Sequence, residues 1–532
     1  MNVAELAVKC LENEGVEIVF GIPGEENIDL MEAIGDSRLR FVLARHEQAA
    51  AFMADVFGRL TGRAGVCLAT LGPGATNLVT GVADAFLDRS PLVAITAQES
   101  LSRIHRESHQ FIDTQRLFAP ITKWNARIEC ADTTAEAVRK AFKIAQAEKP
   151  GSTHLELPAD VARAATRGRP LSWERTRRPS PDRLSLDRAA ELIRRANRPL
   201  ILAGNGVIRG GASDELTRFA EGLQIPVVHT LMCKGAISWD SPMSLFVLAH
   251  SSTDYHAAGF VDADLVICCG YDLVEYDPKD WNPSGRQRIV HIDFTSAEVS
   301  AEYVPEVEIV ADIRETIQLL RERVQSPKDP GAVRARRTSL LAGLGRDGEG
   351  SPGRSDPRRI VRALRAALGP DDLLISDVGA HKMWIGRYFP AYRPNTVIVS
   401  NGLASMGIAL PGGIAAKMVL PERRVVTVSG DGGFLMNVQE LETARRERTP
   451  TVNIIFRDEG LGSIRIKQTA RAGRTVGTEF GNPDYVQLAE AFGARGFRAA
   501  GPAEFEGILR AALSANELTV IDVPVDYSES PF

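Results

Sequence analysis

Two apolar runs that each lead to an acidic residue constrain the fold of this chain more than any other feature. Residues 425–429 form one run and lead to Asp431, and residues 452–456 form the other and lead to Asp458. Between them, residues 437–448 have apolar side chains at every third position, which predicts a helix. In a strand–helix–strand unit of this kind the two strands lie side by side, so both acidic residues meet at the carboxyl edge of the sheet.

Glycines follow the first of these acidic residues. Gly432 and Gly433 allow the backbone to approach an anion at the start of a helix, where free N–H groups and the helix dipole favour phosphate. Two carboxylates would repel a diphosphate there unless a divalent cation lay between them, and Mg²⁺ takes such oxygen ligands. A glycine turn with an acidic helix cap would explain Asp431 alone. The second acidic strand end, at Asp458, favours the metal site.

This arrangement resembles the metal–diphosphate motif of thiamine diphosphate enzymes. In that family a Gly-Asp-Gly, here residues 430–432, is followed some two dozen residues later by Asn or Asp, and then by a glycine whose carbonyl binds the metal. Asp458 and Gly460 match the later positions, although charged residues replace the neutral ones beside Asp458. The resemblance therefore implies thiamine diphosphate and Mg²⁺ as cofactors, with these metal ligands and diphosphate contacts: Asp431, Asp458, Gly460, Gly432 and Gly433.

Strands alternate with helices along most of the chain, which predicts an α/β fold class with doubly wound parallel sheets. At 532 residues the chain is long enough for several domains of roughly 100–200 residues each. Two stretches rich in proline, arginine, glycine or serine separate three such regions. The resemblance implies a pyrimidine-binding domain at 1–163, a central Rossmann-like domain at 186–324 and a diphosphate-binding domain at 357–532.

Composition excludes several classes of protein. A formal net charge of −5 is too small to indicate a nucleic-acid or membrane-surface partner, and no apolar run approaches about 18 residues. The first residues lack the charged-then-apolar pattern of a signal peptide. Six scattered cysteines, in mostly apolar runs without metal-site or redox spacing, predict reduced core residues. We therefore expect a cytoplasmic protein with no nucleic-acid and no membrane partner.

Glu47 lies where a predicted strand ends and a helix of small residues begins. A carboxylate at this position could simply satisfy free helix N–H groups. However, residues 45–50 and 72–77 resemble the pyrimidine-binding domain of the same family, in which the glutamate hydrogen-bonds N1′ of the aminopyrimidine. A carboxyl group in an apolar pocket can share its proton with that ring nitrogen and so activate the cofactor. The resemblance implies that Glu47 is catalytic and that the cofactor contacts in this domain include Gly72, Pro73 and Asn77.

A polar loop at residues 108–113 contains a second candidate. Polar loops often have no function beyond solvation. In the acetolactate synthase branch of the family, a His-Gln-x-x-Asp stretch at this place borders the substrate pocket. The resemblance extends that catalytic-site role to Gln110 and to His109.

The third region contains further candidates at the ends of two predicted strands. The strand 372–376 leads to a helix start suited to phosphate oxygens, where Gly379 and Ala380 lie. After the strand 396–400, the resemblance implies that Ala404 and Met406 contact the cofactor, Met406 as the bulky apolar residue that holds it in a bent shape. Ordinary core packing is the alternative for a methionine.

The central region has a weak nucleotide-binding signal. Its loop 204–211 contains Gly-x-Gly followed by a third glycine one position late. Residues 271–278 lack the Arg- and Asp-rich pattern of the FAD-containing acetohydroxyacid synthases and resemble the FAD-free, catabolic acetolactate synthases. We therefore expect a structural Rossmann-like domain without a flavin.

The resemblance covers essentially the whole chain and implies an acetolactate synthase, a transferase that condenses two pyruvate molecules to 2-acetolactate and CO₂ through a carbanion-enamine on the cofactor. Three alternatives stay open: another thiamine diphosphate-dependent 2-oxo acid decarboxylase, an FAD-linked pyruvate oxidase or biosynthetic acetohydroxyacid synthase, and a cofactor-binding protein without turnover. The presence of Glu47, Met406, Asp431 and Asp458 favours an enzyme. In this family the two halves of each site meet across a subunit interface, so we expect a homodimer or homotetramer that buries at least about 2,000 Å².

Overall fold

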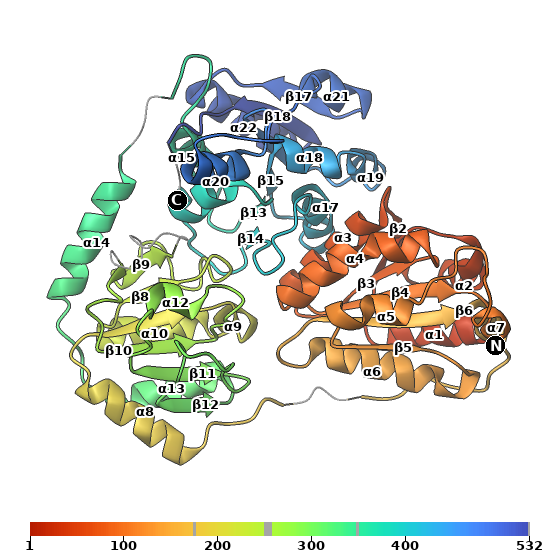
Figure 1. Ribbon diagram of the computed structural model, residues 1–532, viewed down its shortest axis with the longest axis horizontal. Helices are drawn as coiled ribbons and strands as arrows, with labels where there is room; N and C mark the ends of the chain where they lie inside the picture. The colour runs from red at the N-terminus through yellow and green to blue at the C-terminus, as the bar shows by residue number, and fades with distance from the viewer. Residues whose placement is uncertain (174–176, 249–257, 347–349, 530–532) are drawn as a thin grey trace.

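The computed structural model describes residues 1–173, 177–248, 258–346 and 350–529. Within these residues the strands form three six-stranded parallel sheets, each flanked by helices (Figure 1). The expected fold class, an α/β protein with three doubly wound parallel-sheet domains, is confirmed. The three sheets are built in the same way. Parallel strands are joined by crossover helices, and these helices bury both faces of the sheet.

The first sheet has the strand order β2-β1-β3-β4-β6-β5. Its strands β3, β4 and β6 are buried at every position, which explains their nearly continuous apolar sequence. The strands are β1 (Ile18–Gly21), β2 (Arg40–Leu43), β3 (Gly65–Ala69), β4 (Leu92–Gln98), β5 (Trp124–Arg127) and β6 (Ser152–Pro158). The helices are α1 (Val3–Asn13), α2 (Ile28–Gly35), α3 (Glu47–Thr61), α4 (Pro73–Leu87), α5 (Thr114–Phe118), α6 (Thr134–Gln146) and α7 (Ala159–Arg163).

The central sheet has the order β12-β11-β10-β7-β8-β9. If the six strands are numbered by their position in the chain and read from the β9 edge, this is the Rossmann order 3-2-1-4-5-6. In that order the ligand crevice lies between the two central strands, here β7 and β10. The strands are β7 (Pro199–Ala203), β8 (Val227–His229), β9 (Ser244–Val247), β10 (Leu265–Cys269), β11 (Ile289–Asp293) and β12 (Val307–Val310). The helices are α8 (Arg183–Arg195), α9 (Gly206–Arg209), α10 (Ser213–Leu223), α12 (Pro278–Trp281) and α13 (Ile313–Val324), and α14 (Gly331–Leu344) follows them.

The third sheet repeats the order of the first, as β14-β13-β15-β16-β18-β17. In such an order the strand sequence reverses between β13 and β15, so a ligand crevice is expected beyond their carboxyl ends. The strands are β13 (Leu373–Ser376), β14 (Val397–Val399), β15 (Val425–Gly430), β16 (Val452–Arg457), β17 (Arg495–Arg498) and β18 (Thr519–Pro524). The helices are α15 (Pro357–Ala367), α16 (Ala380–Tyr388), α17 (Ala409–Val419), α18 (Asp431–Met436), α19 (Glu440–Arg446), α20 (Gly462–Ala472), α21 (Tyr485–Ala491) and α22 (Pro502–Ala515).

One expected helix is shorter than the sequence predicts. Residues 437–448 do not form a single helix; α18 begins at Asp431 itself and ends at Met436, and α19 starts only at Glu440. Asn437 lies at the break, where its side-chain amide donates to the carbonyl oxygen of Gly407 at 2.8 Å. This tertiary hydrogen bond fixes a non-helical residue inside an otherwise helical apolar pattern, which periodicity alone does not reveal.

An ion cluster joins the first and third domains. The guanidinium of Arg59, on α3, contacts the buried carboxylates of Asp55, Asp84 and Asp88 at 2.7–3.1 Å. It also donates to the carbonyl oxygen of Val399, at the end of β14, at 2.7 Å. Burial acts to lower the pKa of Arg59, but the three carboxylates outweigh it and raise the pKa further. The cluster therefore ties helices of the first sheet to a loop of the third.

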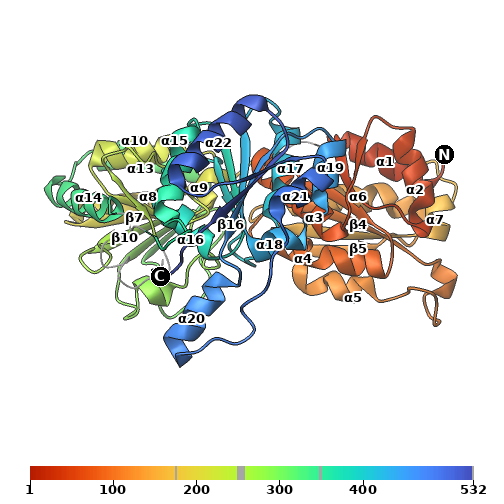
Figure 2. The ribbon, with the colours of Figure 1, turned by 90° about the horizontal axis from the view of Figure 1, so that it is seen from above.

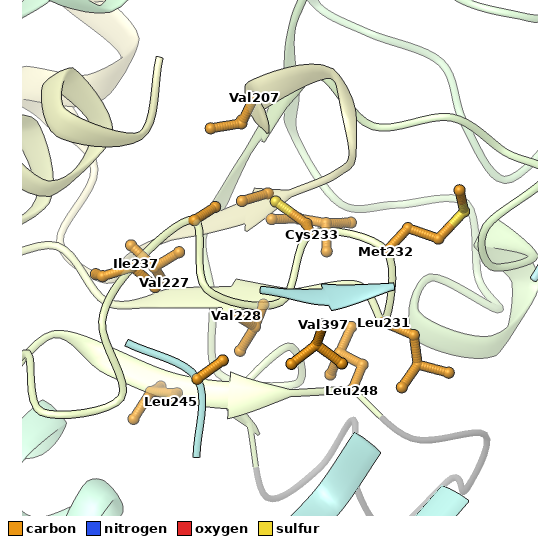
Figure 3. Close-up of a cluster of buried hydrophobic side chains, with 14 of the residues drawn as sticks. Val207, Val227, Val228, Leu231, Met232, Cys233, Ile237, Leu245, Leu248 and Val397 are labelled. Atoms are coloured by element: carbon orange, nitrogen blue, oxygen red, sulfur yellow. The ribbon is translucent and has the colours of Figure 1, made fainter. Parts of the chain in front are cut away.

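The central and third domains share an apolar contact. Figure 3 shows Val397, from β14 of the third sheet, among central-domain side chains that include Val228, Leu231 and Leu248. These residues are buried and belong to one cluster that spans both domains. The contact packs β14 against the central domain.

The prediction that the cysteines are reduced core residues is wrong at one position. All six are free thiols, and five of them are buried, but Cys130 is exposed because it lies in the loop before α6. Among the described residues, no helix is both long enough and apolar enough to cross a bilayer.

We expect Arg59→Ala to reduce the free energy of unfolding by about 3–5 kcal/mol, because it leaves three buried carboxylates without their cation. Arg63→Ala is the matched control. Its guanidinium pairs with Glu17 at 2.9 Å with both side chains largely exposed, so the change should stay within about 1 kcal/mol. Denaturant titration of the two variants and the wild type measures both effects. Equal losses in the two variants would contradict the structural role of the cluster.

Candidate active site

The two acidic strand ends come together as the sequence predicts. β15 and β16 pair in parallel, with Gly430 opposite Phe456, so Asp431 and Asp458 leave neighbouring strands at the same edge. Both side chains are buried, at 0% and 5% exposure. Two carboxylates held this close in a dry environment repel each other, and a bound cation would relieve that repulsion.

Three donors hold the carboxylate of Asp431. The backbone N–H of Gly432 donates to Oδ1 at 3.0 Å, and that of Glu459 donates to Oδ2 at 2.7 Å. The side-chain amide of Asn482 also donates to Oδ2, at 2.8 Å, and is itself bound by the hydroxyl of Tyr485 at 2.9 Å. The orientation of Asp431 is therefore set by β16 and by the segment before α21.

The carboxylate of Asp431 affects the pKa of Asp458. Burial and the nearby carboxylate of Asp431 raise the pKa of Asp458 to about 7, although Arg465 acts to lower it. Arg465 extends from α20, which projects from the third domain (Figure 2), and its guanidinium contacts Asp458 Oδ2 at 2.6 Å. A cation of the protein itself thus lies against one of the two acids. The pair fits a divalent metal ion, because oxygen donors of this charge are what Mg²⁺ prefers.

A metal at this position would need ligands besides side chains. Among the residues that the structure describes, no group of three His, Cys, Asp or Glu side chains could hold a metal ion. Gly460 supplies a backbone carbonyl two positions after Asp458, and its own backbone packs against Thr478 so closely that a Cβ would lie 2.4 Å from the Thr478 carbonyl oxygen. Two carboxylates, one carbonyl and ligand oxygens match the donor set that the sequence implies.

A cavity of about 810 Å³ opens beside this pair, lined by Asp458, Arg465, Phe480, Tyr527 and other residues. The hydroxyl of Tyr527 is buried without a hydrogen-bond partner among the described residues. An unsatisfied polar atom beside a cavity is unfavourable unless something binds there. The cavity therefore has the position and the polar lining of a ligand site.

The charged residues beside Asp458 neutralise each other. The guanidinium of Arg457 contacts Glu459 at 2.6 Å and Asp522 at 2.8 Å, and Arg354 also pairs with Glu459. Partial burial acts to raise the pKa of Glu459, but the two arginines outweigh it and lower the pKa. The charge of Glu459 is therefore paired, and its remaining effect is a minor one that acts to raise the pKa of Asp458.

A second group of predicted residues surrounds the crevice between β13 and β15. Gly433 packs against the carboxyl group of Asp377, where a Cβ would lie 3.2 Å from it, and Gly432 packs against Phe480. Gly379 and Ala380 lie at the start of α16. Burial raises the pKa of Asp377 to about 6, and backbone N–H groups that include that of Gly407 act to lower it. Asp377 thus fixes the glycine turns on both sides of the crevice.

His381 is a residue of this crevice that the sequence prediction missed. Its ring packs against Gly379 and lies 3.4 Å from the place a Cβ on Gly430 would occupy. Burial lowers the pKa of His381 to about 3, and its Nε2 has no hydrogen-bond partner among the described residues. The other ring nitrogen donates to the backbone of Asp377, so Nε2 of the neutral imidazole is an acceptor that fits an N–H or O–H group of a ligand.

The loop after β14 is held in an unusual backbone conformation. Ala404 has φ of +58°, in the left-handed region that non-glycine residues rarely adopt. The backbone N–H groups of Ser405 and Gly407 are bound by Ser400 and Asp377 at 3.0 and 2.8 Å. Met406 lies between them and is partly exposed, so it is not a fully packed core residue.

The first domain contains the other half of the predicted site. The carboxylate of Glu47, 7% exposed, accepts a hydrogen bond from the amide of Asn77 at 2.9 Å and lies 3.3 Å from the place of a Cβ on Gly74. Gly72 has φ of +46°, and Pro73 begins α4 beside it. The sequence pairs these residues correctly because β2 and β3 end at the same edge of the sheet.

Gln110 and His109 lie on an exposed loop at this edge. The carbonyl oxygen of Gln110 approaches Gly72 so closely that a Cβ there would lie 2.4 Å away, and Gln110 has φ of +57°. The structure therefore brings Gln110 to the Gly72 turn. His109 is exposed beside it.

Hydrogen bonds hold the two halves of the site in different domains. Glu47 is bonded within the first domain, and Asp431 is bonded within the third. Near Glu47 the two domains are joined by another side chain. Glu440, at the start of α19, accepts hydrogen bonds from the backbone N–H groups of Arg45 and His46 at 3.0 and 3.1 Å.

Comparison with known proteins identifies the class that this fold and site define. The thiamine pyrophosphate enzyme N-terminal TPP binding domain matches residues 1–117, the central domain matches 186–320, and the C-terminal TPP binding domain matches 377–523. The chain belongs to the thiamine pyrophosphate (thiamine diphosphate) enzyme family. It is an enzyme of this family, whose N-terminal and C-terminal domains bind the cofactor.

Several relatives are similar over their whole length. Acetolactate synthase from Bacillus subtilis is 36% identical, over 99% of this chain and 94% of that protein. Catabolic acetolactate synthase from Raoultella terrigena is 37% identical, over 99% and 96%. The large subunit of acetolactate synthase isozyme 1 from Escherichia coli is 33% identical, over 99% and 95%. The chain is thus similar to catabolic and to other acetolactate synthases.

The hydrogen bond from Asn482 to Asp431 generates a prediction. We expect Asn482→Ala to weaken Mg²⁺-dependent binding of thiamine diphosphate by about 10-fold or more, because it removes a donor that orients a metal ligand. Glu490→Ala, an exposed change on the same segment, should leave binding unchanged. Calorimetric titration of both variants at several Mg²⁺ concentrations measures the effect. Unaltered Mg²⁺ dependence in Asn482→Ala would remove Asp431 from the metal site.

Proposed function

We propose that the protein is an acetolactate synthase that uses thiamine diphosphate and Mg²⁺ to condense two pyruvate molecules to 2-acetolactate and CO₂. The observation that supports this best is the buried pair Asp431 and Asp458 at the edge of a sheet, in a chain similar throughout to acetolactate synthases. The thiamine ring supplies a carbon nucleophile that also stabilises the negative charge left by decarboxylation. The chain must bind this cofactor, supply a proton route and orient pyruvate.

Binding of the diphosphate and the metal falls to the third domain. Asp431, Asp458 and the Gly460 carbonyl would hold Mg²⁺, and Arg465 would leave Asp458 as the metal arrives. The glycine turns at Gly432, Gly433, Gly379 and Ala380 would receive phosphate oxygens. Ala404 and Met406, held in a constrained loop, would contact the thiamine portion.

Proton transfer falls to the first domain. Glu47 would exchange a proton with the aminopyrimidine ring, because its carboxylate is buried and held in one orientation by Asn77. Gly72 and Pro73 allow close approach of the ring at the start of α4. The exposed residues His109 and Gln110, next to this turn, would border pyruvate.

The complete site requires both halves. In this family the two halves of each site meet across a subunit interface, so we propose a homodimer or homotetramer in which Glu47 of one subunit faces Asp431 of another. The exposed Met436, Leu403 and Ile464, near the third-domain half, fit an interface. Five buried, reduced cysteines are compatible with a cytoplasmic location.

Within the acetolactate synthases we propose the catabolic, flavin-free type. Residues 271–278 lack the charged pattern of the flavin-dependent relatives. The alternatives are a biosynthetic acetohydroxyacid synthase, an FAD-linked pyruvate oxidase and a simple decarboxylase. The similarity to the isozyme 1 large subunit keeps the biosynthetic type as the second candidate.

Product analysis tests the reaction. With pyruvate, thiamine diphosphate and Mg²⁺, we expect one CO₂ for each two pyruvates consumed and 2-acetolactate as the product. Chelation of Mg²⁺ should abolish turnover and its return should restore it. Acetaldehyde or acetyl phosphate as the main product would contradict the carboligase and favour the decarboxylase or oxidase.

Glu47→Gln tests the proton route. The substitution keeps the shape and the contact with Asn77 but removes the exchangeable proton. We expect thiamine diphosphate to bind as before, while exchange of the thiazolium C2 proton and turnover fall by about 10² or more. Glu25→Gln, an exposed carboxylate at a helix start in the same domain, is the control and should remain active. Turnover near the wild-type value in Glu47→Gln would return Glu47 to a structural helix-end role.

A further inference from the structure

A buried carboxylate occupies the ligand crevice of the central domain. In a sheet of Rossmann order, ligands bind where the strand order reverses, beyond the carboxyl ends of β7 and β10. These two strands pair in parallel, with Ala203 opposite Cys269. Glu275, in the segment that follows β10, is only 2% exposed there. Figure 3 shows apolar residues of the central-domain core, including Val207, Val227 and Cys233.

Donors from three strand ends converge on this one side chain. After β7, the backbone N–H of Asn205 donates to both oxygens of Glu275, at 3.0 and 3.3 Å. After β8, the hydroxyl of Thr230 donates to Oε2. After β10, the backbone N–H of Asp272 donates to Oε1 at 3.4 Å. Donors that converge from separate loops on one anion form the arrangement by which proteins hold a phosphate.

The glycine loop is closed around the carboxylate. The N–H of Gly206 donates to the carbonyl oxygen of Gly270 at 2.8 Å, and a Cβ on Gly206 would lie 2.5 Å from Gly270 Cα. A Cβ on Gly204 would lie 2.8 Å from Oε1 of Glu275. The glycines therefore permit the loop to approach Glu275 and its own chain, and no space for a phosphate remains between them.

Cationic charge also faces this position. Arg209, four residues after Asn205, has Nε and Nη1 buried without hydrogen-bond partners among the described residues, and its Nε lies 3.7 Å from Glu148. Burial raises the pKa of Glu275 to about 7, and the hydrogen bonds of Thr230 and Asn205, together with Arg209, act to lower it. These groups offset only part of the cost of burying the carboxylate, and the hydrogen bonds hold it in one orientation at this edge.

A route from solvent reaches the same loop. A cavity of about 730 Å³ lies among the three domains, and Asn205, Arg209 and Gly211 contribute to its lining. Other lining residues are basic and come from the first domain and the linker, among them Arg139, Lys143 and Arg178. An anion that entered this cavity would meet the residues next to Glu275.

We propose that Glu275 is a built-in substitute for a ligand phosphate, and that it is the residue that excludes dinucleotides from the central domain. Its carboxylate takes the donors of Asn205, Thr230 and Asp272 that a pyrophosphate would need. Removal of the side chain vacates an anion site of phosphate size. The proposal rests on the flavin-free state of the proposed function and adds the residue responsible for it.

Inorganic phosphate is the probe, and Glu275→Ala and Glu275→Gln are the matched variants. Glu275→Ala vacates the site, so phosphate should raise its melting temperature by at least about 2 °C relative to chloride at equal ionic strength. Glu275→Gln fills the same space without the charge, so phosphate should have no specific effect on it. The wild type should show no response to phosphate or to added FAD. Isothermal titration of phosphate into each folded variant, below its melting temperature, measures the same contrast directly.

The outcomes separate the two proposals. Purified wild-type protein with a stoichiometric flavin absorbance would overturn both the flavin-free assignment and the role of Glu275. Colourless wild type together with a Glu275→Ala variant that gains no phosphate binding would overturn the role of Glu275 alone. A phosphate response in Glu275→Gln equal to that of Glu275→Ala would also overturn the role of Glu275, because the glutamine side chain still fills the anion site. If Glu275→Ala does not fold, two other measurements decide. Specific binding of FAD by the wild type, or of phosphate by Glu275→Gln, contradicts the proposal. The absence of both kinds of binding supports it.

Discussion

Repulsion between two buried carboxylates is the constraint on which the third domain depends. The parallel register of β15 and β16 brings Asp431 and Asp458 to one edge, and burial raises the pKa of Asp458 to about 7. Several neighbouring groups compensate this charge: Asn482 and two backbone N–H groups bind Asp431, Arg465 contacts Asp458, and arginines pair with Glu459. A site built in this way favours a divalent cation and, through that cation, a diphosphate.

The same physical rule explains the other buried charges. A carboxylate removed from water is stable only with donors or cations around it. Arg59 provides the cation for three aspartates between the first and third domains, and Glu275 receives donors from three loops of the central domain. In the first case the compensation joins domains. In the second, we propose, it occupies a crevice that relatives of this fold use for a ligand.

Sequence patterns predict the parts of this protein that depend on local chemistry. Continuous apolar strands predict the three sheets, and strand-end residues such as Glu47 and Asp431 are placed correctly because parallel strands end at one edge. The patterns miss what depends on distant contacts. Asn437 breaks a helix through a hydrogen bond to Gly407, His381 packs against the distant Gly430, and Asn482 reaches Asp431 from a separate segment. The Asn-Pro-Asp sequence before α21 was the available signal for Asn482, but it indicates a helix start and not its partner.

Subunit complementation tests the central claim that each site combines Glu47 of one subunit with Asp431 of another. Glu47→Gln and Asp431→Asn should each be inactive alone. In a dimer of the two variants, one site has both substitutions and the other has neither. An equal, fully exchanged mixture should therefore recover about one quarter of wild-type turnover, from symmetry alone. Exchange confirmed by mass spectrometry without any recovered turnover would contradict the shared site and place both residues in the catalytic centre of a single chain.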